Sequence, residues 1–223
     1  MIDSARVTVA ALAATVMLLL AACSSEDTAP RAHDLLLSAS QLPEPGWTPL
    51  TGTDPESSEP PGPTQPECSN QSRTLRTAEM TGTASAAWKN ESDVGVESVS
   101  SHAFVYTNAA AAASALASYR DLVSRCTRWE NGKSPSGRPA TIGEQELFDA
   151  PAGEESVARQ SGIVHPYFTD IPTFRTYWVA SRVGQSIVQI TYDPEWPLDT
   201  KQGREKAKGL AAVAAANVEN HSG

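Results

Sequence analysis

The sequence predicts an α+β domain, with an antiparallel sheet, helices packed on one face and a single disulfide. Stretches rich in Val, Ile, Phe, Tyr and Trp, which are typical of strands, occupy the middle and the last third of the chain. Two alanine-rich segments, 109–129 and 200–220, carry apolar residues at steps of three and four, the period of a helix. These strands and helices do not alternate as regular β-α-β units, which favours an antiparallel sheet.

The N-terminus has the three parts of a bacterial export signal. Residues 1–22 comprise a short start containing Arg6, an apolar stretch over 7–20, and two small residues before Cys23. The apolar stretch is shorter than the roughly 20 residues that span a bilayer, so a cleaved signal is favoured over a membrane helix. The Leu-Ala-Ala-Cys sequence ending at Cys23 is typical of a lipobox, where the signal is cut and the new N-terminal cysteine is acylated. Cleavage of an ordinary secreted protein at the small residues is the alternative.

The charge of the chain narrows the classes of partner. The formal net charge is −9, which argues against nucleic acid as a partner and against electrostatic adhesion to anionic lipid headgroups. Membrane attachment then depends on acyl chains such as palmitate on Cys23, and more than one chain is needed for stable anchoring. We therefore expect a protein anchored at the extracytoplasmic face of the cell membrane. Residues 23–32 would be a flexible tether and 33–223 a single monomeric domain.

Two further cysteines, Cys68 and Cys126, predict the disulfide. An exported protein folds in an oxidising compartment, where an even pair of cysteines is normally bridged. A metal site is the alternative, but neither cysteine has a His or Cys neighbour at ligand spacing.

The segment before the sheet is expected to hold a short helix, a turn and a long loop. Residues 34–41 are expected to form the helix, which the Pro-Glu-Pro-Gly stretch at 43–46 ends. Trp47 follows and is expected to pack on the core. Residues 51–66 contain five prolines and almost no apolar side chains, which predicts a mobile loop.

The middle of the chain predicts strands at 85–90 and 94–107 and then the clearest helix. Asn108 is a favourable N-cap for that helix. The helix, over 109–129, is expected to end at the Asn-Gly pair that follows it. Its buried face is expected to carry Leu116, Tyr119, Leu122, Val123 and Cys126.

The last third predicts a strand at 156–162, a hairpin and a closing helix. The strands of the hairpin are 174–183 and 186–192, joined by a two-residue turn at Gly184. The closing helix covers 200–220. Its inner face is expected to carry Ala207, Leu210, Ala211, Ala214 and Val218.

The order of these features resembles a known family. The lipobox comes first, then the Leu-Leu-Leu opening at 35–37 with Gly46-Trp47 downstream, then Cys68, then Phe104 leading into an alanine-rich helix that ends at Cys126. This order resembles the PknH-like extracellular sensor domain, found on actinobacterial receptor serine/threonine kinases and in stand-alone lipoproteins. The resemblance implies an α+β domain with a cleft that binds an unidentified ligand. The kinase domain has two disulfides and this chain can form one. No kinase region is present, so signalling would need a separate partner.

One segment, 163–178, concentrates aromatic side chains around a few polar ones. Such a mixture is typical of ligand clefts and of partner-binding surfaces. In the alternative interpretation, Tyr177 and Trp178 point to opposite faces of a strand and one is core. The candidate ligand or partner surface comprises His165, Tyr167, Phe168, Arg175 and Trp178.

No catalytic motif accompanies this segment. A nucleophile elbow, a Walker A loop, an H-E-x-x-H sequence and paired C-x-x-C sequences are all absent. We therefore expect no enzyme activity, catalytic residue, cofactor or metal. The predicted function is a binding or sensing module for an unknown ligand or envelope protein. A carrier of lipid or another hydrophobic molecule is the alternative, and it would need a large apolar cavity. An envelope hydrolase would need a Ser, Asp or Glu side chain bonded to His102 or His165.

Overall fold

The computed structural model describes a sheet, long helices and short 3-10 turns. The strands are β1 (Thr48–Pro49), β2 (Met80–Glu91), β3 (Val96–Tyr106), β4 (Arg128–Lys133), β5 (Pro139–Phe148), β6 (Glu155–Val164), β7 (Phe174–Val183) and β8 (Ser186–Asp193). The helices are α1 (Ala109–Arg125) and α2 (Thr200–His221), and the turns are η1 (Ala32–Leu35), η2 (Ala39–Gln41), η3 (Pro66–Cys68) and η4 (Gln71–Leu75). The described residues are 30–51, 65–68, 70–93, 95–133, 139–164, 174–194 and 199–221.

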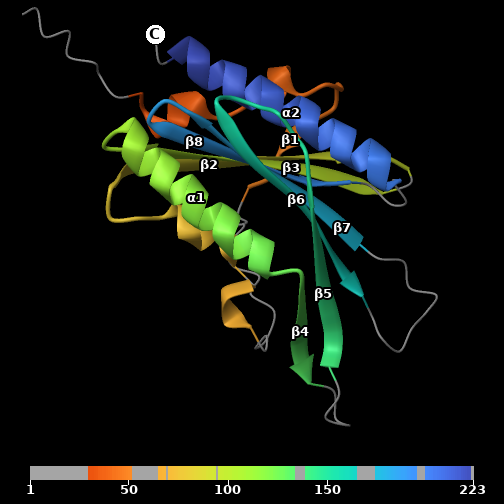
Figure 1. The fold of residues 1–223 in the computed structure, drawn as a ribbon. Helices are drawn as coiled ribbons and strands as arrows, with labels where there is room; N and C mark the ends of the chain where they lie inside the picture. The colour runs from red at the N-terminus through yellow and green to blue at the C-terminus, as the bar shows by residue number, and fades with distance from the viewer. Residues whose placement is uncertain are drawn as a thin grey trace, which may run out of the picture.

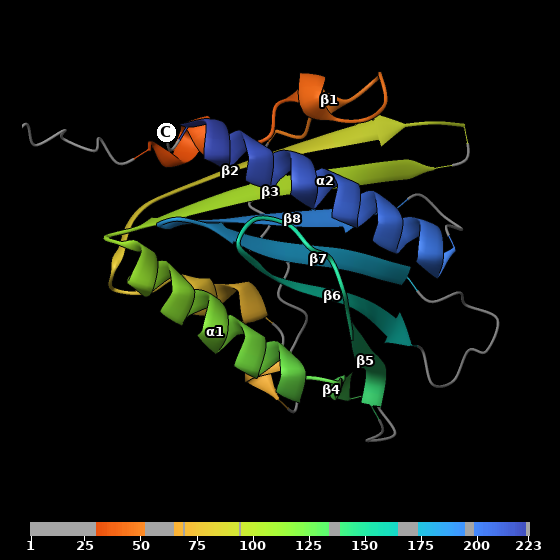
Figure 2. The same cartoon turned by 45° about the horizontal axis from the view of Figure 1, so that its top comes forward.

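The long helices cover opposite faces of one sheet. Its eight strands pair antiparallel in the order β1-β2-β3-β8-β7-β6-β5-β4. In both Figure 1 and Figure 2, α1 and α2 lie on opposite sides of this sheet. The α+β class and the antiparallel sheet predicted from the sequence are confirmed. The prediction that the helices pack on one face is wrong.

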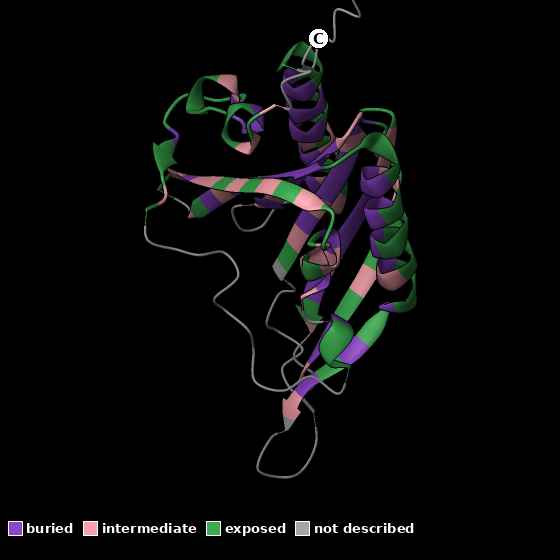
Figure 3. Ribbon diagram, turned by 90° about the vertical axis from the view of Figure 1, so that its left-hand side faces the viewer, coloured by how far each residue is buried: buried purple, intermediate pink, exposed green. Residues whose placement is uncertain are grey.

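The central strands explain why both faces carry a helix. Successive side chains of a strand point to opposite faces of the sheet. In β7, Tyr177 and Val179 pack in the core beneath α2, whereas Ala180 packs beneath α1. In β8, Ile190 and Ile187 divide between the two cores in the same way. A strand that is apolar on both faces must pack against other elements on both faces. The central strands are accordingly largely buried (Figure 3).

Helix α2 approaches the sheet closely near its start. A Cβ added at Gly203 would lie 2.4 Å from the ring carbon Cζ of Tyr177, so only glycine fits there without a shift. Tyr177 itself is completely buried. The inner face predicted for this helix is confirmed, since all of its members are buried: Ala207, Leu210, Ala211, Ala214 and Val218.

A poorly exposed ion pair fixes α2 to the sheet. Lys206 pairs with the carboxylate of Glu97 in β3, which is 6% exposed. The Tyr192 hydroxyl donates a hydrogen bond to the same carboxylate at 2.6 Å. Burial and the adjacent Glu97 carboxylate raise the pKa of Tyr192 above its usual range. Because Lys206 also contacts Glu44 at 3.1 Å, one ammonium connects α2, the sheet and the segment before it.

That N-terminal segment packs on the core without a regular helix. In place of the predicted helix at 34–41, the chain forms the turns η1 and η2, with Leu36 in extended conformation between them. Leu35, Leu36 and Leu37 are all buried. Three consecutive residues point in different directions around a helix, so one packed stripe would not bury them all. Trp47 is 8% exposed within the same core, which confirms that it packs there.

Helix α1 begins as predicted and ends early. The Asn108 side chain accepts a hydrogen bond from the backbone N–H of Ala111 at 2.9 Å, as an N-cap does. The helix ends at Arg125 rather than near residue 129, and the chain continues as β4. Trp129 of β4 lies over Gly143 of β5, where an added Cβ would be 2.1 Å from the indole ring. The strands β4 and β5 were not predicted from the sequence.

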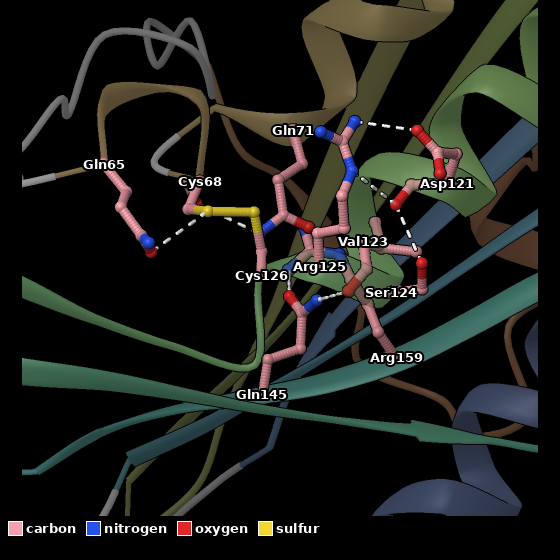
Figure 4. Close-up of a disulfide and its surroundings, with 10 residues drawn as sticks. All are labelled: Gln65, Cys68, Gln71, Asp121, Val123, Ser124, Arg125, Cys126, Gln145 and Arg159. Carbon is pink, nitrogen blue, oxygen red and sulfur yellow. Dashed lines mark hydrogen bonds and ion pairs between the residues drawn. A yellow bond between two sulfur atoms is a disulfide. The ribbon is translucent and has the colours of Figure 1, made fainter.

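The predicted disulfide between Cys68 and Cys126 is confirmed. The two Cα atoms are 5.5 Å apart, and both cysteines are buried against Trp129, with Leu122 packed beside them. Figure 4 shows the bridge beside the end of α1. The cysteines are separated by 58 residues along the chain. The chain-entropy model gives about 4 kcal/mol of stabilisation for a loop of this size.

The other predicted strands and the hairpin are present in the structure. The strands expected at 85–90, 94–107 and 156–162 are present as β2, β3 and β6, and β2 begins earlier. The hairpin of β7 and β8 turns at Gly184, whose φ is +55°, a value that favours glycine. Most of the proline-rich segment 51–66 lies outside the described residues. No helix in the described part of the chain is long and apolar enough to cross a membrane.

The close approach of α2 generates a stability prediction. Gly203→Ala is expected to lower the free energy of unfolding by about 1–3 kcal/mol, because the added methyl would overlap the Tyr177 ring. Gly209→Ala in the same helix is the control. Nothing lies within 4 Å of the Cβ added there, so better helix propensity should raise stability by up to about 1 kcal/mol. Urea unfolding followed by circular dichroism measures both variants, and equal stabilisation by the two would contradict this packing.

Candidate functional site

The face of the sheet beneath α1 has an apolar part and a polar part. α1 covers the apolar part, where Phe104, Ile187 and Ala180 pack against its buried residues. Farther along the same strands, the side chains that point to this face are mostly polar. We call this set the polar sheet face. It comprises Ser98, Ser100 and His102 of β3, Gln189, Thr191 and Asp193 of β8, Thr176 and Trp178 of β7, and Arg159 and Ser161 of β6.

Strand pairing places the central members of this face in one row. Ser100 lies opposite Thr191, and Thr191 lies opposite Trp178. Trp178 lies opposite Arg159 on its other side. The two hydroxyl residues and Trp178 are half-buried. Four adjacent strands thus hold hydroxyl groups, an indole ring and a guanidinium group side by side, on a rigid support.

Arg159 is a buried cation held by neutral groups. Arg159 is 5% exposed. Nε donates a hydrogen bond to the Tyr119 hydroxyl at 3.0 Å, and Nη1 donates to Oε1 of Gln145 at 2.9 Å. The guanidinium carbon lies 3.7 Å from the centre of the Trp178 ring, a cation–π contact. These contacts fix the position of the positive charge.

Gln145 and Tyr119 connect Arg159 to α1. Nε2 of Gln145 donates to the carbonyl oxygen of Val123 at 2.7 Å, within the last turns of the helix. The Tyr119 hydroxyl, on the buried face of α1, also accepts a hydrogen bond from Nε2 of Gln189 at 3.2 Å. Figure 4 shows Arg159 and Gln145 beside the helix end that carries the disulfide. The guanidinium group therefore sits where the end of α1, β5 and β6 meet.

Asp193 brings a carboxylate to the same face. One of its oxygens accepts a hydrogen bond from the Thr176 hydroxyl, and the other accepts from the Ser98 hydroxyl at 3.3 Å. Burial raises the pKa of Asp193 above its usual range, and the two hydrogen bonds oppose this shift only in part. On the polar sheet face, Arg159 thus donates hydrogen bonds to neutral acceptors, and Asp193 accepts hydrogen bonds from neutral donors.

The opposite face of the sheet has a charged groove near the start of α2. The groove has a volume of about 320 Å³ and contains Gly162 with charged and amide side chains around it. Arg128 pairs with Glu144 beside it. Arg175 borders the groove and donates to the hydroxyl of Thr200. Gln145 and Ser161 also border the groove, but its charged pair, Arg128 with Glu144, is exposed, whereas Arg159 is buried.

The two residues of the predicted surface that the structure describes, Arg175 and Trp178, lie on opposite faces of the sheet. Trp178 lies on the polar sheet face and is half-buried, while its neighbour Tyr177 is the core residue. Arg175 lies on the other face, in the charged groove. An odd separation along a strand places two side chains on opposite faces, so Arg175 and Trp178 do not share a face of the sheet. The predicted residues that lie outside the described part of the chain are Cys23, His165, Tyr167 and Phe168.

Sequence reasoning missed Arg159 and Asp193. In β6, polar residues point to both faces of the sheet, because Arg159 and Ser161 alternate with Gln160. The alternation of polar and apolar residues therefore could not identify the buried face of this strand. Asp193 ends β8 and resembles an ordinary residue at the end of a strand. His102 stacks on Phe104, with ring centres 6.5 Å apart. Within the described residues, no three His, Cys, Asp or Glu side chains form a group that could hold a metal ion.

The raised pKa of Asp193 generates a pH prediction. A carboxyl group whose pKa is raised by folding opposes folding where it is ionised, and that cost disappears as the pH falls towards its unfolded pKa of about 3.9. Asp193→Asn is therefore expected to raise the free energy of unfolding at pH 7, with a gain that shrinks towards pH 4. Urea unfolding at pH 7, 5.5 and 4 measures this difference. A variant that is less stable by the same amount at every pH would show that the buried charge is not costly.

Comparisons with known proteins bear on the fold. No known family model matches the sequence, and no curated protein does. Among solved structures, the extracellular domain of PknH from Mycobacterium tuberculosis aligns with a TM-score of 0.55 at 13% identity, covering 82% of this chain and 94% of that one. A putative uncharacterized protein from Mycobacterium smegmatis aligns with a TM-score of 0.45 at 14% identity, over 86% and 98% of the two chains. The predicted resemblance is confirmed at the level of fold, which is similar to that of the PknH extracellular domain.

Proposed function

We propose that this chain is an extracytoplasmic binding module of the sensor type, anchored to the membrane through lipid on Cys23. The polar sheet face would be its binding surface, and a small ligand is the occupant that we favour. The observation that carries the proposal is the buried guanidinium of Arg159, held against Trp178 on a half-buried row of polar groups. The fold similarity to an extracellular domain supports the location.

The polar sheet face has the composition of a ligand site. Binding sites combine aromatic surface with a few fixed polar groups. Here Trp178 supplies the aromatic surface, Arg159 supplies directed donors, and the hydroxyls of Ser100 and Thr191 can each donate or accept. All of these groups come from adjacent strands rather than loops, so little ordering is required when a ligand binds.

Binding is favoured over transport of a lipid. A carrier needs a large enclosed apolar space, but small residues bring both helices close to the sheet. In α2 these include Gly203 and Ala207, and in α1 they include Ala112 and Ala115, all of them buried. The charged groove near α2 is open and lined mostly by polar residues. Catalysis is not proposed, because the sequence carries none of the motifs expected of an envelope hydrolase.

The anchor is tested by Cys23→Ala. Because the acidic domain has no electrostatic attraction to anionic lipid, the variant is expected to leave the membrane fraction after export while its melting temperature stays unchanged. Ser25→Ala is the matched control and should remain with the membrane. Fractionation followed by a high-salt wash distinguishes the two. A Cys23→Ala protein that stays membrane-bound after the wash would contradict lipid anchoring.

The binding surface is tested by filling it. Ser100→Tyr places a bulky side chain on the polar sheet face, whereas Val213→Tyr places one on α2, where the native side chain is 39% exposed. Native mass spectrometry of the full protein purified from a bacterial envelope is expected to show a noncovalent ligand on wild type and Val213→Tyr. Ser100→Tyr should carry at most about a tenth of it.

Other outcomes of this experiment have definite meanings. A lipid retained by all three proteins would favour the carrier. An unliganded mass for all three, with no co-purified envelope protein that Ser100→Tyr loses, would contradict a binding role for this face.

A further inference from the structure

We infer that the polar sheet face takes an anionic ligand, whose carboxylate or phosphate group contacts the guanidinium of Arg159. This inference rests on the proposed binding role of the face and adds the charge and chemical class of what it binds.

Arg159 has no carboxylate partner among the described residues. Arg182, Arg204 and Lys206 are poorly exposed too, with side chains 11%, 25% and 20% exposed, and each pairs with at least one carboxylate. Arg159 is buried more deeply, yet its hydrogen-bond partners among the described residues are a phenol and an amide. A buried charge without an opposite charge is costly. An anionic ligand would supply the charge that the described chain does not.

The guanidinium group of Arg159 has N–H donors that the described residues do not use. Nε and Nη1 of Arg159 are engaged, whereas Nη2 has no hydrogen bond to any residue that the structure describes. Guanidinium groups bind carboxylates and phosphates through parallel N–H donors. Trp178 beneath the group and the bonds to Tyr119 and Gln145 hold it in place. The free donors are therefore preorganised, which lowers the cost of binding an anion.

The residues beside Arg159 offer hydroxyl groups and an aromatic ring. Thr191 and Ser161 lie beside Trp178 and Arg159 in the strand register and are half-buried, so their hydroxyls can donate to further oxygens of an anion. One residue of the polar sheet face is acidic: Asp193, which accepts hydrogen bonds from Thr176 and Ser98. The half-buried Trp178 offers an apolar surface for the body of the ligand.

A purely structural role for Arg159 is the competing explanation. The side chain bridges α1, β5 and β7, so it could serve only to brace the end of the helix. The two roles differ in one measurable respect. The stability of the protein would not depend on anions if Arg159 were purely structural. If Arg159 binds an anion, added anion raises the stability saturably, and it does so at constant ionic strength.

The test uses the full protein with inorganic phosphate and acetate as probes. The melting temperature is measured at increasing probe concentration, with sodium chloride adjusted to keep ionic strength constant. One or both probes should raise it saturably, by at least 2 °C, in wild type and in Arg175→Gln, which alters the arginine of the opposite face. Arg159→Gln should abolish the rise. Arg159→Lys, which keeps the charge and loses the planar donors, should require at least about ten times more probe.

The outcomes separate the sources of the anion. A response to phosphate alone assigns a phosphorylated ligand, and a response to acetate alone assigns a carboxylate. No response to either probe, or an equal response in Arg159→Gln, would overturn the inference and leave Arg159 as a brace. If Arg159→Gln does not fold, the comparison of wild type with Arg159→Lys decides the question. A neutral ligand in the mass-spectrometry experiment would overturn the inference that the ligand is anionic, while leaving the proposed binding function intact.

Discussion

The architecture depends on the double-sided burial of the hairpin formed by β7 and β8. Tyr177 and Ile190 pack into one core and Ala180 and Ile187 into the other. A hairpin of this kind cannot lie at a solvent-facing surface without exposing one apolar face. The hairpin therefore lies at the centre of the sheet and requires a helix on each side. The contact of Gly203 with Tyr177 shows how closely α2 approaches the sheet.

The two helices do not cover their faces equally. α1 ends at Arg125, and the chain continues through Cys126 of the disulfide into β4, whose Trp129 packs on the bridge. The same side of the sheet therefore keeps a polar part beyond the helix, with Arg159 at its boundary. Gln145 joins the guanidinium to the helix end, so the disulfide supports the position of Arg159 indirectly. Fold stability and the candidate site thus share one junction.

Local patterns predicted much of this fold, because they are set by neighbours in the sequence. Helical spacing placed α2, the content of β-branched and aromatic residues placed the hairpin, and the turn at Gly184 and the cap at Asn108 followed from residue type. The failures have a common cause. The opposite placement of the helices, the strands β4 and β5, and the separation of Arg175 from Trp178 depend on which face each strand buries. In β6, polar residues point to both faces of the sheet, so the sequence alone does not show which face is buried. Tertiary packing decides it.

Site-specific photocrosslinking in living cells tests the central claim most directly, namely that the polar sheet face is the binding surface. A photoreactive amino acid is placed at Thr191, on the polar sheet face, and separately at Ser114, on the exposed side of α1. A covalent adduct is expected from position 191 and none from position 114. Adducts from position 114 alone, or equal adducts from both positions, would contradict it.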